Sequence, residues 1–388
     1  MSGVLLGLLE PVFWLCAGGV VYTYLGYPFL ITLLARVQPA PPVRKAPQTP
    51  AVSIVIAVHN EEDTIERKLG NCLALDYPTD RLEVVVASDG SDDRTNLIVT
   101  SYPAGRVRLV EAPRGGKAQA LNAGVAAATG DVLVMTDARE EIESRAVREL
   151  VANLSDPAVG AVSGELHIRG FEEAEGGEGV GLYWRYEKAI RRAESLYDST
   201  VGVTGALYAV RRELFLPLDP RTVLDDVAVP MQVVLAGYRV VFDSAARVFD
   251  RVADTPRREY GRKTRTLAGN YQLVSLMPDL LEPARNRLFI QLLSHKLARL
   301  AVPWCLLVLY AGSALLAREG RVLYLAAFAA QSVFYLLAVF GWLRSRFGRG
   351  PRFLDFFYSF TFLNLAAAVG LVAFLRGTAT AGWKGGAS

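Results

Sequence analysis

The stretch Val52-Ser-Ile-Val-Ile-Ala-Val-His-Asn-Glu-Glu62 decides the fold, because a mostly β-branched apolar run ends directly in polar residues. Such a run is typical of a strand that is buried on both faces of a parallel sheet. Similar runs follow at residues 82–88, 107–111 and 132–136, separated by stretches with the composition of helices. Strands that alternate with helices predict βαβ units. We therefore expect an α/β domain with a mostly parallel sheet over residues 51–252.

Apolar segments flank this domain on both sides. Residues 12–35 form a run long enough to cross a bilayer core of roughly 30 Å, and residues 288–316, 322–343 and 353–375 form three more. The first run lacks the basic start and the cleavage site of a secretory signal, so we interpret it as an uncleaved anchor. A basic, amphipathic stretch at residues 257–281 predicts a helix at the membrane surface.

The number of membrane spans follows from charge as well as from apolar length. Four spans are predicted, within a range of three to five, because the run that contains His295, Lys296 and Arg299 could instead be an interfacial piece plus a shorter span. Basic residues gather in the loop 344–352 and after the first span. By the positive-inside rule these flanks and the α/β domain face the cytosol. We expect a multi-pass protein of the cell (inner) membrane.

Six regions result from this division of the chain. They are an N-terminal membrane helix (1–37), a proline-rich linker (38–50), the α/β domain (51–252), interfacial helices (253–284), three membrane helices (285–376) and a C-terminal tail (377–388).

Composition excludes several classes of protein. With 52% hydrophobic and 21% charged residues, the chain is too apolar for an ordinary soluble protein and too charged for a pure membrane bundle. The net charge of +3 comes without a basic stripe, which argues against nucleic-acid binding. Three cysteines and three histidines are scattered along the chain, so disulfides and a zinc site are not expected. A bound metal would need oxygen ligands.

Polar side chains follow the predicted strands at the point where each strand ends. Asn60 and Glu61 follow the first strand, Asp89 the second and Asp137 the fourth, while Lys117 comes after a glycine pair and opens a helix. The carboxyl ends of parallel strands meet at one edge of a sheet, where ligands bind. Each residue also has a purely structural explanation, as a helix cap, an Asx-turn or a solvated lysine.

Two adjacent carboxylates form the last element of interest. Asp225 and Asp226 precede an apolar helical segment, where they could serve as a helix cap and a first-turn acid. A carboxylate there could also act as a general base. If Asp225 caps the helix, Asp226 is the better placed base.

Taken in order over residues 51–270, these elements resemble the inverting family 2 glycosyltransferases, which have a GT-A nucleotide-sugar domain with a Rossmann-like sheet. That family includes the membrane synthases of cellulose, hyaluronan, chitin and poly-N-acetylglucosamine. The resemblance implies that Asn60, Glu61 and Asp89 hold the uridine and that Lys117 lies near the nucleotide. It also implies that Asp137 is the aspartate of the DxD motif.

The acceptor side of the site follows from the same resemblance. It implies that Asp226 is the general base of the TED or ED motif. It also implies that the residues around the acceptor and the diphosphate are Thr204, Gly205, Asp225, Arg262 and Arg265. Asp137 is then the expected ligand of Mg²⁺ or Mn²⁺ against the two phosphates.

The chain departs from the family pattern at two places. Arg139 occupies the second position of DxD, and a guanidinium cannot bind a cation, so metal binding rests on Asp137 with phosphate oxygens. Alternatively, Arg139 itself neutralises the diphosphate. The QxxRW motif of processive synthases appears as Arg262-Lys-Thr-Arg-Thr266, without the glutamine and the tryptophan. This change weakens the expectation of processive polymer synthesis.

The resulting prediction is an enzyme. We expect an inverting glycosyltransferase that moves a sugar from a nucleotide-sugar, with a UDP-sugar as the expected donor, to an acceptor hydroxyl at the membrane. Extracellular polysaccharide synthesis is the leading role, and transfer of a single sugar to a lipid acceptor is the alternative. A catalytically silent nucleotide-binding scaffold is the alternative from another class. The expected partners are the nucleotide-sugar, a carbohydrate or lipid-linked acceptor, and the bilayer.

Overall fold

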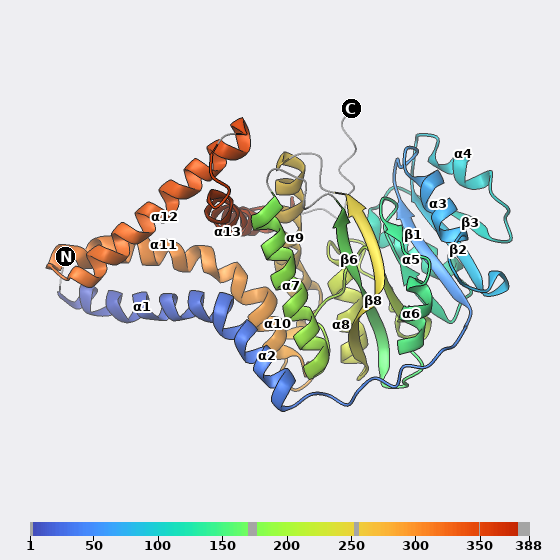
Figure 1. Ribbon diagram of the computed structural model, residues 1–388, viewed down its shortest axis with the longest axis horizontal. Coiled ribbons are helices and arrows are strands. Elements are labelled where there is room, and N and C mark those ends of the chain that lie inside the picture. Colours follow the sequence, from blue (N-terminus) through green and yellow to red (C-terminus); the bar gives the residue numbers. More distant parts are fainter. Residues whose placement is uncertain (1–2, 170–176, 252–255, 349, 379–388) are drawn as a thin grey trace.

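The computed structural model describes residues 3–169, 177–251, 256–348 and 350–378. Within these ranges only the backbone is described for residues 3–6, 177–184, 251, 256–260 and 262. Figure 1 shows a sheet domain at one end of the molecule and long helices at the other.

An eight-stranded sheet with the order β3-β2-β1-β4-β7-β6-β8-β5 forms the centre of the α/β domain (Figure 1). The strands are β1 (Val52–Val58), β2 (Leu82–Asp89), β3 (Val107–Ala112), β4 (Val132–Met135), β5 (Glu141–Ile142), β6 (Val159–Arg169), β7 (Tyr208–Arg211) and β8 (Arg239–Arg251). β1 pairs in parallel with β2 and β4, and β2 pairs in parallel with β3. The four strands predicted from the sequence are thus confirmed.

The second half of the sheet reverses direction at β7. This strand is antiparallel to both β4 and β6, whereas β6 and β8 pair in parallel. The short β5 pairs antiparallel with β8 at the far edge. The prediction of an α/β fold with a mostly parallel sheet is confirmed, and the strands around β7 make the sheet mixed.

Helices cover both faces of the sheet. They are α3 (Ile65–Leu73), α4 (Thr95–Thr100), α5 (Lys117–Ala127), α6 (Ala146–Asn153) and α8 (Asp225–Leu235). Helix α5 lies very close to the sheet, because a Cβ added at Gly124 would be only 2.9 Å from Cγ1 of Val55. Glycine is therefore the residue that fits at that point.

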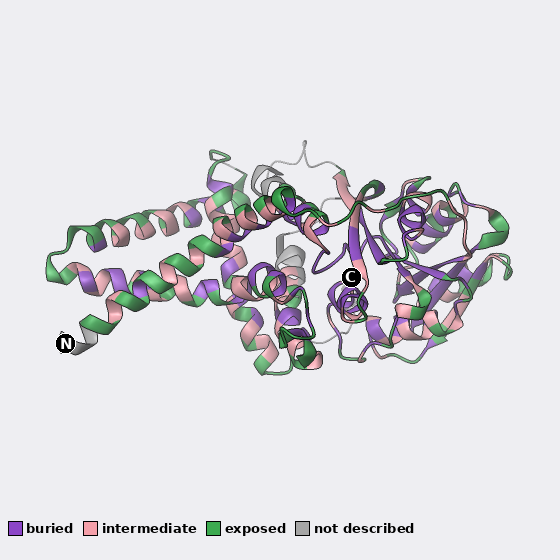
Figure 2. Ribbon diagram, turned by 90° about the horizontal axis from the view of Figure 1, so that it is seen from below, coloured by how far each residue is buried: buried purple, intermediate pink, exposed green. Residues whose placement is uncertain are grey.

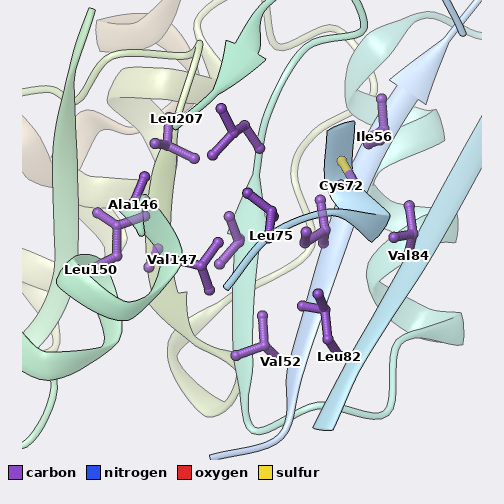
Figure 3. Close-up of a cluster of buried hydrophobic side chains, with 14 of the residues drawn as sticks. Val52, Ile56, Cys72, Leu75, Leu82, Val84, Ala146, Val147, Leu150 and Leu207 are labelled. Carbon is purple, nitrogen blue, oxygen red and sulfur yellow. The ribbon is translucent and has the colours of Figure 1, made fainter. Parts of the chain in front are cut away.

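Two apolar cores result from the alternation of side chains along the strands. Val52, Ile54 and Ile56 of β1 point to the core beneath α3 and α6, which Figure 3 shows together with Cys72 and Leu150. The alternate residues of the same strand point to the other core, beneath α5 and α8. A strand fully buried on both faces is expected to be a major source of stability, since each large apolar side chain contributes about 1.5–3 kcal/mol on burial.

Four helical segments are long and apolar enough to cross a membrane, by length and composition. They comprise α1 (Gly3–Val21), η1 (Tyr22–Gly26) and α2 (Tyr27–Val37); α10 (Phe289–Leu292), η5 (Leu293–Leu297), α11 (Ala298–Leu316) and η6 (Ala317–Glu319); α12 (Val322–Phe347); and α13 (Leu354–Leu375). Figure 2 shows much of their surface as exposed or intermediate. Large apolar side chains such as Leu15 and Leu307 are exposed there, as is expected of a lipid-facing surface.

The first two of these segments each contain a π-helical turn. η1 and η5 lie side by side, because the hydroxyls of Tyr22 and Ser294 are 2.7 Å apart. The segment that includes His295 is one continuous helical stretch, and how much of it lies within a membrane stays a prediction. π-turns inside helices occur frequently at functional sites.

Two further helices connect the sheet domain with the apolar segments. α7 (Gly177–Tyr197) packs against α2, and α9 (Pro256–Leu276) packs against α13. The helix predicted at residues 257–281 corresponds to α9 and the following short turn η4 (Pro278–Leu281). The predicted boundaries between the regions remain predictions.

Candidate active site

Lys117 lies at the centre of a group of carboxylates. Its Nζ is 2.9 Å from Oδ1 of Asp137 and 3.2 Å from Oδ2 of Asp225, so one ammonium bridges two acids from different elements. Burial alone would lower the pKa of Lys117, but the two carboxylates outweigh burial and raise the pKa well above its usual value. Conversely, burial would raise the pKa of Asp137, but Lys117 lowers it. Lys117 and Asp137 therefore stabilise each other's charged forms.

Asp89 holds the loop that leads to Lys117. Its carboxylate accepts hydrogen bonds from the backbone N–H of Gly115 at 2.7 Å and of Gly116 at 2.9 Å, and the side chain is fully buried. Gly116 has a φ of 96°, which favours glycine, and Lys117 follows it as the first residue of α5. Asp89 therefore positions Lys117 within this structure. Its predicted contact with uridine stays a prediction.

Asn60 and Glu61 lie at the end of β1 and tie it to the loop after β2. The Asn60 side chain donates to the Asp92 carboxylate at 2.6 Å and accepts from the Asp92 N–H at 3.0 Å. The N–H of Glu61 donates to Oγ1 of Thr95 at 2.8 Å. Asn60 has a left-handed φ of 54°, which asparagine tolerates better than most residues. The two turns predicted to contact the nucleotide are thus joined to each other.

Asp226 is the acid whose environment suits a general base. Burial, followed by the negative charge of Asp225, raises the pKa of its carboxyl from 3.8 to about 6. Its backbone carbonyl accepts the Val203 N–H at 2.9 Å. A pKa near the working pH lets one carboxylate both take up and release a proton.

Thr204 and Gly205 form the loop beside this base, as predicted. A Cβ added at Gly205 would lie 3.7 Å from Oδ2 of Asp226, so the loop packs directly against the carboxylate. The Thr204 N–H donates to Oγ of Ser163 at 3.1 Å, and Thr204 is buried. The structure therefore brings the loop and the base together.

The interpretation of Asp225 as a helix cap is wrong. Asp225 is itself the first residue of α8, and the preceding Leu224 occupies the cap position without a side-chain hydrogen bond. The Asp225 carboxylate turns instead to Lys117. Asp225 therefore lies within ion-pair distance of an ammonium from a distant element.

The two predicted arginines are not joined to the carboxylate group by any described contact. Arg265 is exposed on α9. The side chain of Arg262, also on α9, falls outside the described part of the chain. Their role toward an acceptor or a diphosphate stays a prediction.

Tyr208 is a site residue that reasoning from the sequence missed. It is fully buried on β7, and its hydroxyl has no hydrogen-bond partner among the described residues. Burial and then the charge of Asp225 raise the pKa of Tyr208 well above its usual value. A buried hydroxyl without a partner is costly unless a ligand or water satisfies it. The tyrosine within Thr204-Gly-Ala-Leu-Tyr208 was the available signal.

A second missed group lies beneath Asp137. The Lys68 ammonium, buried on α3, donates to Oγ1 of Thr136 and to the Glu140 carbonyl, both at 2.8 Å, and burial lowers its pKa. Glu140 is also buried, and burial followed by the charge of Asp137 raises the pKa of its carboxyl to about 7. The signal in the sequence was a glutamate directly after the predicted metal motif.

The donor set fits a hard divalent cation that is shared with a phosphate ligand. Asp137 and Asp225 both reach a single ammonium, which shows that two carboxylates of the site converge on one positive charge. Among the described residues, no group of three or more His, Cys, Asp and Glu side chains could enclose a metal ion. Oxygen ligands from a bound phosphate would therefore have to complete the coordination of Mg²⁺ or Mn²⁺.

Comparison with known sequences places the sheet domain among glycosyltransferases. Residues 53–216 match the model of glycosyl transferase family 2. A probable glycosyltransferase of Bacillus subtilis is 28% identical over 273 residues, which are 63% of this chain and 61% of that protein. A poly-beta-1,6-N-acetyl-D-glucosamine synthase of Staphylococcus aureus is 26% identical over 246 residues, 61% of this chain and 58% of that protein. The chain thus spans about three fifths of the length of these curated relatives.

A solved structure matches nearly the whole chain. It is a mannosyltransferase from Pyrobaculum calidifontis in complex with GDP-Man and Mn²⁺, with a TM-score of 0.72 and 25% identity. The match covers 95% of this chain and 99% of that one, so it includes the apolar helices as well as the sheet domain. The matched domain, the fold and the curated relatives agree, so residues 53–216 form a glycosyl transferase family 2 domain and the chain is similar to glycosyltransferases of that family.

Proposed function

We propose that this protein transfers a sugar from a nucleotide-sugar to an acceptor hydroxyl at the membrane, with inversion at the anomeric carbon. The observation that carries the proposal is the group formed by Lys117, Asp137, Asp225 and Asp226. Lys117 could bind the diphosphate directly, and Asp137 could bind it through a metal ion. Asp226, whose pKa is raised to about 6, is the candidate base. Inverting transfer needs one base and a stabilised leaving group.

In the proposed reaction Asp226 accepts the proton of the acceptor hydroxyl. The hydroxyl oxygen forms a bond to the anomeric carbon from the face opposite the diphosphate, while the bond from that carbon to the diphosphate oxygen breaks. The nucleoside diphosphate leaves with the bonding electron pair. Lys117 lies beside Asp137, where its charge would stabilise the leaving phosphates. No covalent enzyme intermediate is needed.

A divalent cation has a defined place in this scheme. Asp137, together with the phosphate oxygens of the donor, would hold Mg²⁺ or Mn²⁺, which neutralises negative charge on the leaving group when it is bound. The match to a mannosyltransferase structure that contains Mn²⁺ supports this assignment. Asp225 is the other carboxylate within reach of the same position, which offsets the absence of an acid at Arg139.

The donor and the acceptor are the less determined parts of the proposal. The resemblance implied a UDP-sugar, whereas the neighbour that matches the whole chain was solved with GDP-Man, so GDP-mannose is the first donor to test. The poly-N-acetylglucosamine synthase relatives support polymer assembly. The altered motif at residues 262–266 and the mannosyltransferase neighbour favour transfer of a single sugar.

The proposed location is the cell (inner) membrane. Four apolar helical segments support membrane insertion, and the basic loop at residues 344–352 supports a cytosolic position for the sheet domain. Sugar donors of this kind are charged and would reach the site from the cytosol.

The test uses the full chain, purified in detergent and returned to lipid. It is incubated with radiolabelled GDP- and UDP-sugars and with membrane lipid extract, with and without Mn²⁺. We expect label in the lipid or polymer fraction, dependent on Mn²⁺ or Mg²⁺. Product size then separates a polymer from one added sugar. If no donor of either class gives labelled product, the proposal fails.

A further inference from the structure

The ammonium of Lys68 joins the two ends of a short segment that contains Asp137, here called the metal segment (residues 136–140). Lys68 lies on α3, and only 1% of its surface is exposed. Its Nζ donates to Oγ1 of Thr136 and to the carbonyl oxygen of Glu140, both at 2.8 Å. These acceptors lie one residue before and three residues after Asp137. One buried cation therefore closes the metal segment into a loop.

Thr136 carries this connection onward to the loop beside the candidate base. Its hydroxyl has one proton, which it donates to the carbonyl oxygen of Ala206 at 2.8 Å while it accepts the hydrogen bond of Lys68. Ala206 directly follows Gly205, and Gly205 packs against the carboxylate of Asp226. A continuous path of hydrogen bonds therefore runs from α3 through the metal segment to the loop beside the base.

This path supports the site from below and does not reach a substrate itself. Asp137 is partly exposed, whereas Lys68 and Thr136 are buried. A buried charge is costly unless hydrogen bonds satisfy it, so a lysine at this position needs an explanation. Groups that orient a metal ligand are sensitive positions, because their loss typically weakens metal binding or activity about 10-fold to 100-fold.

We propose that Lys68 and Thr136 are positioning residues that hold Asp137 in place for a divalent cation and its bound diphosphate. This inference rests on the proposed function, since it assigns the support of the metal site in that reaction. Through the bond to Ala206, the same pair sets the spacing between the metal segment and the loop beside the base. That spacing matters for transfer, because a misplacement of reacting groups by roughly 1 Å can cost about 10²-fold in rate.

Asn71 offers a matched control on the same helix. It lies three residues after Lys68 on α3, and its side-chain amide donates to the Ile142 carbonyl at 2.9 Å and accepts from the Ile142 N–H at 2.8 Å. Like Lys68, it thus makes two hydrogen bonds from α3, but they go to β5, outside the metal segment. A general loosening of α3 should therefore appear in N71L, whereas a loss of positioning should appear only in K68M.

The first experiment measures metal binding apart from transfer. Mn²⁺ is titrated into the full chain in detergent with saturating GDP, and in parallel with saturating UDP, while the electron paramagnetic resonance signal reports free Mn²⁺. We expect K68M and T136V each to weaken Mn²⁺ binding about tenfold or more. T136S, which keeps the hydroxyl, and N71L should bind Mn²⁺ as the wild type does.

Three outcomes of this titration overturn the proposal. They are wild-type affinity in K68M and T136V, an equal loss of affinity in N71L, and no Mn²⁺ binding by the wild type with either nucleotide. The thermal midpoint of each variant is measured alongside, because K68M and N71L both leave hydrogen-bonding groups without partners and should both lower it. If K68M does not fold, the comparison of T136V with T136S remains the test, since only the serine keeps the hydroxyl.

The transfer assay separates this inference from the proposed function. K68M should need about tenfold more Mn²⁺ for half of its maximal rate. Mn²⁺ binding that depends on Lys68 and Thr136, without transfer from any donor, would remove the proposed function and keep the positioning role. Transfer with the wild-type dependence on Mn²⁺ in both K68M and T136V would do the reverse.

Discussion

The two sides of the candidate site differ in how far their polar groups are satisfied. On the side of Asp137, Lys117 is matched by two carboxylates, and Asp89 is matched by the N–H groups of the loop before it. Around Asp225 and Asp226, by contrast, the buried hydroxyl of Tyr208 has no hydrogen-bond partner among the described residues. Buried polar groups are rarely left unpaired without a functional reason.

Lys117 and Asp89, on the side of Asp137, therefore have their partners before a substrate binds, whereas the Tyr208 hydroxyl on the side of Asp226 has none among the described residues. The paired side keeps its shape by itself, so changes there should cost both stability and activity. The unpaired side is held by its surroundings and lacks a ligand, so changes there should cost activity with little loss of stability. The following predictions test this distinction, from the largest expected effect to the smallest.

Replacement of Asp226 by Asn should have the largest effect. The amide cannot take up the proton of the acceptor, so kcat for transfer is expected to fall about 10³-fold. D219N is the control, because Asp219 is an acid that pairs with Arg221 outside the site. Transfer is measured with labelled donor at saturating acceptor. Wild-type turnover in D226N would remove Asp226 from the role of base.

Replacement of Lys117 by Met should lower both the stability of the protein and the rate of transfer. Without the ammonium, the carboxylates of Asp137 and Asp225 repel each other, so the thermal midpoint should fall and transfer should slow about 10²-fold. K188M is the control, since Lys188 pairs with Glu165 on a different part of the domain. An unchanged midpoint would show that the paired side is not a structural unit.

The pH dependence of transfer should report the base. The pKa of Asp226 is raised to about 6, and its deprotonated form is the active one, so kcat/KM should fall about tenfold between pH 7 and pH 5. The folded chain holds this proton to a higher pH than the unfolded chain, so the group itself stabilises the fold more as the pH falls through 6. A flat profile down to pH 5 would contradict the assignment.

Replacement of Tyr208 by Phe should have the smallest effect on transfer, and it separates a role in substrate binding from a role in stability. The hydroxyl has no described partner, so the change in the free energy of unfolding should stay within about 0.5 kcal/mol. Transfer should slow about threefold to tenfold if the hydroxyl contacts a substrate, which corresponds to one ordinary hydrogen bond. A large loss of stability would show that a water already satisfies this hydroxyl.

Reasoning from the sequence predicted the strands of the first half of the sheet to within a residue or two. Buried parallel strands such as β1 have a local signature, an apolar run that ends in polar residues. The strand β7 was missed, because its four residues have no such signature and are placed by pairing with β4 and β6.

The same limit applies to the site. Asp89, Lys117, Asp137 and Asp226 could be picked out because each lies near the end of a strand or the start of a helix. The pairing of Asp225 could not be predicted, because a helix cap is a local feature, whereas its partner Lys117 comes from another part of the chain. The surroundings of His295 could not be predicted at all, since its two glutamates lie on α7 with nothing in their own sequence to mark them.

The contacts of Tyr27, His295 and Arg299 with α7 have a mechanical consequence. They pin the sheet domain to the membrane helices through buried charge, so the domain cannot tilt without breaking several ionic contacts at once. These contacts fix the distance between the candidate active site and the membrane helices. In the proposed reaction the acceptor would therefore have to present its hydroxyl at that fixed distance, and a growing polymer would have to move past the site.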